Sequence, residues 1–146
     1  MPALDPAKFR DPVLTAGGER RATVPLGRLH TLWFNTGTLC NVTCAHCYIE
    51  SSPRNDRLAY LTLAEVERFL DEIERDRLGT ELIGFTGGEP FLNRALPEMI
   101  DAVLRRGFRA LVLTNAMRPM LRMQARLRPL ARNGARLTIR VSLDHY

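Results

Sequence analysis

The stretch ELIGFTGGEP, residues 81–90, decides the fold. ELIGFT predicts a short β-strand because it is rich in apolar and β-forming residues, and Gly87-Gly88-Glu89-Pro90 follows it without a spacer. In parallel α/β folds, ligands bind at the carboxyl ends of the strands, and paired glycines let a ligand approach the backbone closely. The turn therefore has two interpretations. It is an ordinary turn, or it is a site whose carbonyl groups and Glu89 carboxylate accept hydrogen bonds from an ammonium group.

A helix is predicted on each side of this strand. Thr62 and Glu65 form a capping box at the start of the first helix, and Gly79 ends it. The second helix covers roughly Asn93–Arg106 and stops at Gly107. The apolar stripe of the first helix comprises Leu63, Val66, Phe69, Leu70 and Ile73.

Further strands are predicted at Leu29–Thr36, Arg109–Asn115 and Arg136–Asp144. A third helix is predicted over Pro119–Asn133, with Pro129 kinking or dividing it. Strands that alternate with helices at a spacing of about 30 residues favour parallel pairing with right-handed crossovers. This pattern fits an open Rossmann-type sheet as well as a barrel-type sheet, and periodicity does not choose between them.

The two ends of the chain differ in character. Residues 1–28 are punctuated by proline and glycine, which predicts a loosely structured N-terminal extension, and residues 29–146 form one domain. The chain stops at Tyr146, directly after the last predicted strand. Because an apolar parallel strand left open at an edge promotes aggregation, we expect a truncated chain that a missing C-terminal part or a partner chain completes.

The composition is that of an ordinary protein domain. With 146 residues, 45% apolar and 25% charged, the chain is neither a disordered tail nor a disulfide-dense miniprotein. No apolar run approaches the roughly 20 residues that span a bilayer, and the N-terminus lacks the apolar core of a signal peptide. We therefore expect a cytoplasmic protein without membrane partners.

The basic residues are distributed unevenly. The net charge is +5, and ten arginines but no acidic residue lie between Ala102 and Leu143. This region suits an anionic partner such as nucleic acid. A solvated outer face is the simpler interpretation, because Arg118, Arg122 and Arg126 follow one another at i,i+4 spacing.

The three cysteines form a single cluster, CNVTCAHC, with Cys40, Cys44 and Cys47. A tetrahedral zinc site needs four ligands. The obvious fourth ligand would be His46, but it adjoins Cys47, and the side chains of adjacent residues tend to point apart. A [4Fe–4S] cluster held by three thiolates keeps one iron open for a substrate or cofactor. The spacing favours the iron–sulfur cluster over zinc.

Polar residues also end the third and fourth predicted strands. Thr114 and Asn115 end one, while Ser142 and Asp144 end the other on a single face of the sheet. Each residue alone suits a local cap or turn. Together with the glycine turn they outline one polar site at one end of a sheet.

These motifs resemble those of the radical S-adenosylmethionine (SAM) enzymes. The shared elements are the CxxxCxxC cysteines and Gly87-Gly88-Glu89-Pro90, and the similarity runs from about Leu29 to Tyr146. The endings of strands three and four are similar to the subgroup with molybdenum-cofactor, haem-modifying and peptide-modifying members, although Ala116 stands where glycine is common. The resemblance implies the first half, about four strands, of a partial (β/α)6 TIM-like barrel.

The resemblance also implies a role for each motif. The three cysteines would ligate a [4Fe–4S] cluster, and the amino and carboxylate groups of SAM would chelate the open iron. The implied SAM contacts are Gly87, Gly88 and Glu89 for the amino group, Pro90 for the turn, Thr114 and Ser142 for the carboxylate or sulfonium, Asp144 for the ribose and His46 for the adenine.

The implied reaction is reductive cleavage of SAM to methionine and a 5′-deoxyadenosyl radical, which abstracts hydrogen from a substrate. The electron would come from a donor such as flavodoxin or ferredoxin. The substrate is left open among peptide, RNA and small molecule. The alternative is a non-catalytic iron–sulfur or zinc module that docks a partner through its arginine-rich C-terminal region.

Overall fold

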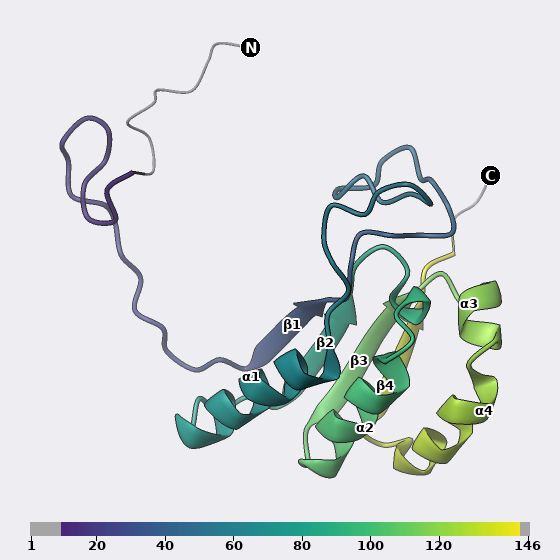
Figure 1. Ribbon diagram of the computed structural model, residues 1–146. Coiled ribbons are helices and arrows are strands. Elements are labelled where there is room, and N and C mark those ends of the chain that lie inside the picture. The colour runs from purple at the N-terminus through teal and green to yellow at the C-terminus, as the bar shows by residue number, and fades with distance from the viewer. Residues whose placement is uncertain (1–9, 144–146) are drawn as a thin grey trace.

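A computed structural model describes residues 10–143 of the chain (Figure 1). These residues contain a sheet of four parallel strands in the order β1-β2-β3-β4. The strands are β1 Thr31–Asn35, β2 Leu82–Thr86, β3 Arg109–Thr114 and β4 Leu137–Val141. The predicted α/β class with parallel βαβ repeats is confirmed.

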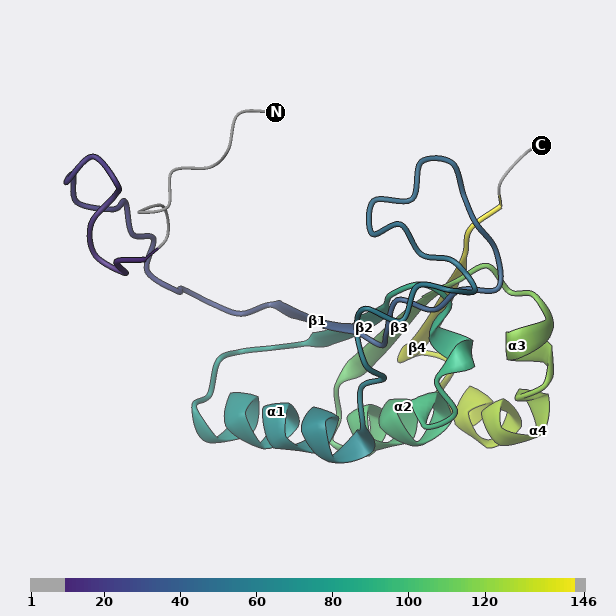
Figure 2. The same ribbon diagram turned by 45° about the horizontal axis from the view of Figure 1, so that its top comes forward.

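The helices decide between the two architectures that the sequence left open. The longer ones are α1 Leu63–Arg75 and α2 Leu96–Arg105; the shorter ones are η1 Pro90–Leu92, α3 Arg118–Leu121, α4 Gln124–Leu127 and η2 Arg128–Asn133. Figure 2 shows α1, α2 and α4 beneath the same face of the sheet. A doubly wound sheet carries helices on both faces, whereas sequential strands with one-sided crossovers are typical of barrel winding. The barrel-type interpretation is therefore confirmed.

The core lies between this face of the sheet and the helices. Phe34, Ile83, Phe85 and Val112 of the strands are each at most 5% exposed. They pack with Val66, Leu70, Ile73, Met99, Ile100 and Val103 of α1 and α2. Full burial of such a side chain contributes about 1.5–3 kcal/mol, so this layer fixes the strand ends from which the site is built.

The predicted capping box of α1 is confirmed. The Thr62 hydroxyl accepts the backbone N–H of Glu65 at 3.3 Å, and the Glu65 carboxyl accepts the N–H of Thr62 at 2.8 Å. Helix α2 begins at Leu96 rather than Asn93. Pro90 first starts the η1 turn, and the side chain of Asn93 then accepts the N–H of Ala95.

The predicted helical segment over residues 119–133 is divided at Pro129, as the sequence indicated, but it also breaks between α3 and α4, where no division was predicted. Pro119 and Pro129 each lie in the first turn of their own element, α3 and η2. Proline suits a first turn but interrupts a helix interior, which explains the division at Pro129. Arg118, Arg122 and Arg126 are exposed as expected, although no single helix carries them.

Residues 10–28 precede the sheet. Leu14 forms an isolated antiparallel bridge with Arg20, and the Asp11 carboxyl accepts the N–H groups of Val13 and Leu14. Figure 1 shows this segment extending away from β1. The boundary at residue 28 stays a prediction. Across residues 10–143, every helix is too short or too polar to cross a bilayer.

Candidate functional site

The cysteine loop leaves β1 and folds back onto the glycine turn after β2. Gly88 N–H donates to the carbonyl of Gly37 at 2.9 Å, and Glu89 N–H donates to the carbonyl of Leu39 at 3.0 Å. A Cβ on Gly88 would lie 2.2 Å from the Leu39 carbonyl oxygen, and one on Gly87 would lie 2.6 Å from that of Gly37. Because Gly87 and Gly88 have no side chains, the cysteine loop can pack directly against the turn. The sequence pattern did not reveal this need for close packing.

Replacing Gly88 by alanine is expected to destabilise the protein by about 1–3 kcal/mol, because the obstructing atom is backbone and the loop has to move. Urea unfolding measures this effect. Gly27→Ala is the matched control, since a Cβ there would meet no atom within 4 Å. Equal unfolding midpoints for the two variants would contradict the close contact.

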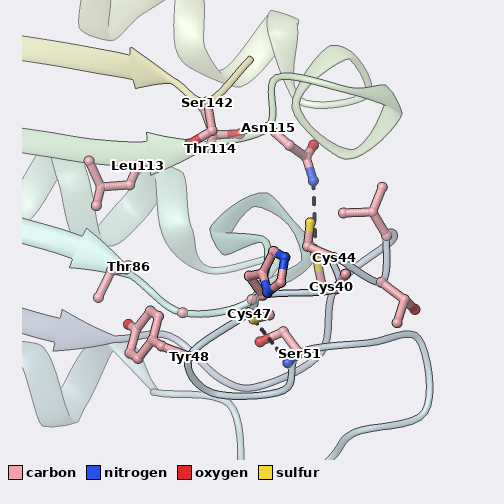
Figure 3. Close-up of a pocket in the computed structure, with 16 residues that line it drawn as sticks. Cys40, Cys44, Cys47, Tyr48, Ser51, Thr86, Leu113, Thr114, Asn115 and Ser142 are labelled. Atoms are coloured by element: carbon pink, nitrogen blue, oxygen red, sulfur yellow. Dashed lines mark hydrogen bonds between the residues drawn. The ribbon is translucent and has the colours of Figure 1, made fainter. Parts of the chain in front are cut away.

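A cavity of about 650 Å³ opens above the carboxyl ends of the strands (Figure 3). Its walls come from the cysteine loop, the glycine turn, the end of β3 and the residue after β4. The lining includes the predicted residues Cys40, Cys44, Cys47, His46, Gly87, Gly88, Thr114 and Ser142. The structure thus brings together residues more than a hundred positions apart, while Asp144 lies outside the described residues.

The three cysteines are not disulfide-bonded and lie in different surroundings. Cys40 is buried, whereas Cys44 and Cys47 are half-buried. Burial raises the pKa of the Cys40 thiol. Burial also opposes ionisation of Cys47, but the backbone N–H groups of Ser51 and Ile49 outweigh it and hold the pKa of that thiol below its usual value. The Ser51 N–H lies 3.2 Å from the Cys47 sulfur.

The donor set is compatible with an iron–sulfur cluster, because three thiols line one cavity. Within residues 10–143, no three His, Cys, Asp or Glu side chains gather tightly enough to hold one metal ion. A [4Fe–4S] cluster takes one thiolate on each of several irons, so its ligands share a cavity rather than a point. The Ser51 hydroxyl is buried in the cavity wall beside Cys47 and has no well-aligned hydrogen-bond partner in the described part of the chain. The sequence carried no signal for Ser51.

Glu89 lies beneath the cavity rather than in its wall. The residue is 2% exposed. One carboxyl oxygen accepts the Thr114 hydroxyl at 2.8 Å and the Phe91 N–H at 3.0 Å, and the other accepts the Asn115 N–H at 2.9 Å. Pro90 is likewise buried, at the start of η1. The Glu89 side chain therefore joins the end of β2 to the end of β3.

The end of β3 places a second polar side chain at the cavity. Asn115, which sequence reasoning noted only as a strand ending, lines the cavity and reaches toward Cys40. Ala116 next to it has φ = 53°, in the left-handed region that favours glycine. This backbone conformation gives the physical reason why glycine suits position 116.

The arginine-rich segment is partly tied to the chain's own acids. Arg106 of the α2 end pairs with Asp71 and Glu74 of α1. The other paired arginines are Arg105 with Asp101, Arg109 with Glu81 and Arg126 with Glu98. The pairs of Arg106, Arg109 and Arg126 join separate segments, whereas the pair of Arg105 with Asp101 lies within α2.

The chain matches a known family over most of its length. The family model of the Radical SAM superfamily matches residues 34–146. The chain belongs to the Radical SAM superfamily, whose shared chemistry is radical generation by cleavage of SAM.

Curated relatives are much longer than this chain. It is 30% identical over 102 residues to the antilisterial bacteriocin subtilosin biosynthesis protein AlbA of Bacillus subtilis, covering 70% of this chain and 21% of that protein. It is 33% identical over 76 residues to the GTP 3′,8-cyclase of Tolumonas auensis, covering 52% and 22%. It is 31% identical over 85 residues to the Fe-coproporphyrin III synthase of Methanosarcina barkeri, covering 56% and 20%.

A solved structure supports the fold. The crystal structure of SuiB from Streptococcus suis bound to S-adenosylmethionine superposes with a TM-score of 0.64 at 21% identity. The match covers 82% of this chain and 26% of SuiB. At this identity the likeness concerns the fold alone.

Proposed function

We propose that the cavity holds a [4Fe–4S] cluster on Cys40, Cys44 and Cys47, with SAM beside it, and that the protein is a radical SAM enzyme. The observation that carries the proposal is that the three cysteines and the glycine turn line one cavity. Its volume of about 650 Å³ lies within the range of small-molecule sites.

When bound, the reduced cluster would supply one electron that cleaves SAM to methionine and a 5′-deoxyadenosyl radical, which takes a hydrogen atom from the substrate. The chain's part is binding and orientation. Cys40, Cys44 and Cys47 supply the thiolates, and the backbone N–H groups around Cys47 stabilise its negative charge.

The remaining lining would hold SAM. Gly87 and Gly88 present backbone groups to the cavity without a side chain in the way. Thr114 donates its hydroxyl proton to Glu89 and accepts the N–H of Ala116, so its oxygen has one acceptor position left for the ligand. Ser142 is exposed, and its hydroxyl would donate to a carboxylate. His46 is exposed on the cysteine loop, where its ring would cover the adenine.

The experiment is anaerobic reconstitution with iron and sulfide, followed by reduction and addition of SAM. The proposal predicts release of 5′-deoxyadenosine and methionine in equal amounts. A protein that carries the cluster but never cleaves SAM would overturn the catalytic assignment.

Reaction partners follow from the chemistry. We infer an electron donor such as flavodoxin or ferredoxin and a reducing, cytoplasmic setting, since a cluster with an open iron needs both a reductant and protection from oxidation. The substrate is a peptide, an RNA or a small molecule. Because the chain spans only a fifth to a quarter of its relatives' length, their individual reactions do not transfer to it.

A further inference from the structure

We propose that Asn115 is a positioning residue that donates a hydrogen bond to the Cys40 thiolate and thereby raises the reduction potential of the cluster. The inference rests on the proposed function, because it assigns a role toward the cluster that Cys40 would hold. Asn115 comes from the end of β3, 75 residues beyond Cys40, so its position is a product of the fold.

The orientation of the Asn115 amide is fixed from both ends. Its oxygen accepts the backbone N–H of Met117 at 3.1 Å. The nitrogen therefore faces the cysteine loop, where it donates to the side-chain oxygen of Asn41 at 3.0 Å and lies 3.8 Å from the Cys40 sulfur. Figure 3 shows this amide pointing from the β3 end to the cysteine sulfur.

The backbone of Asn115 is fixed as well. Its N–H donates to the buried carboxyl group of Glu89, and the preceding Thr114 donates its hydroxyl to the same group. The side chain therefore starts from a rigid strand end, while Cys40 is itself anchored by its N–H bond to the Ser52 carbonyl at 3.1 Å. Because both segments are anchored, the Asn115 amide nitrogen and the Cys40 sulfur are held close to each other.

A donor at this position favours the reduced cluster. Reduction adds negative charge that is shared with the thiolate sulfurs, and an N–H group directed at a sulfur stabilises that charge. Cys40 is 6% exposed, so little water competes for the same sulfur. Removing the donor should therefore make reduction harder without removing a ligand.

The test is a redox titration of the reconstituted cluster, monitored by visible absorption and EPR, in the wild type and in Asn115→Ala. At a fixed solution potential, the ratio of reduced to oxidised cluster should fall about tenfold, which equals about 59 mV for a one-electron couple. Asn115→Asp keeps the side-chain shape and the Met117 contact but replaces the donor by an acceptor. Its ratio of reduced to oxidised cluster should therefore fall at least as far as that of Asn115→Ala. Asn41→Ala is the matched control, because it removes the other partner of the amide but leaves the sulfur contact.

The variants also report on cluster retention. Asn115→Ala should release iron to a chelator faster than Asn41→Ala does. Wild-type potential and release rate in both Asn115 variants would overturn the proposal, and so would equal shifts in Asn115→Ala and Asn41→Ala. Failure of the proposed function is distinguishable, because it appears in the wild type as a missing cluster or as a cluster that does not cleave SAM.

Discussion

Replacing Glu89 by alanine is expected to lower the free energy of unfolding by about 3–5 kcal/mol. The substitution leaves three donors without their acceptor, namely the Thr114 hydroxyl and the N–H groups of Phe91 and Asn115. Each buried donor left unsatisfied costs about 1–3 kcal/mol, and relaxation of the turn recovers part of the sum. Urea unfolding followed by far-UV circular dichroism measures the change.

Glu98→Ala is the matched control. Glu98 also contacts an element later in the chain, through its ion pair with Arg126, but its side chain is about half exposed. Exposed pairs contribute about 1 kcal/mol or less, so this variant should unfold close to the wild type. If Glu89→Ala unfolded at the same urea concentration as Glu98→Ala, the buried carboxyl group would not join β2 to β3 as the hydrogen bonds indicate.

Replacing any one of Cys40, Cys44 and Cys47 by alanine is expected to reduce stable iron loading to about a tenth of the wild-type level or less. Each variant keeps only two of the three thiolates, so two irons of the cluster would have no protein ligand. The loss of a ligand lowers metal affinity steeply. Iron and sulfide analysis after anaerobic reconstitution and desalting measures the retained cluster.

The control for the cysteine variants is Arg54→Ala, which changes an exposed side chain in the same loop. Its iron content should match that of the wild type. Full iron retention in even one cysteine variant would show that the thiol concerned is not a ligand.

The sheet was predictable from the sequence because each strand is a short run of β-forming residues that ends in a polar turn. The Thr62 capping box marked the start of α1 and Gly107 the end of α2, whereas α1 ends at Arg75, before the predicted stop at Gly79. The division of segment 119–133 at Pro129 was predictable from the proline. The break between α3 and α4 was not, because no proline or glycine stands between Leu121 and Gln124.

The meeting of the main motifs at one edge of the sheet was predictable, whereas Ser51 and the contacts within the site were not. The rule that parallel strands end at one edge was enough to place the cysteine loop, the glycine turn, Thr114 and Ser142 around one cavity. The direction of the Glu89 side chain depends on donors 25 and 26 residues later in the sequence. No local pattern encodes such a contact, and the same holds for Asn115 and Cys40.

The most direct test of the central claim is EPR spectroscopy of the anaerobically reconstituted, reduced protein before and after addition of SAM. We predict the signal of a reduced [4Fe–4S] cluster whose shape changes when SAM binds, because the three cysteines leave one iron open to it. Tightly bound zinc in place of iron, or a cluster whose signal is the same with and without SAM, would contradict it.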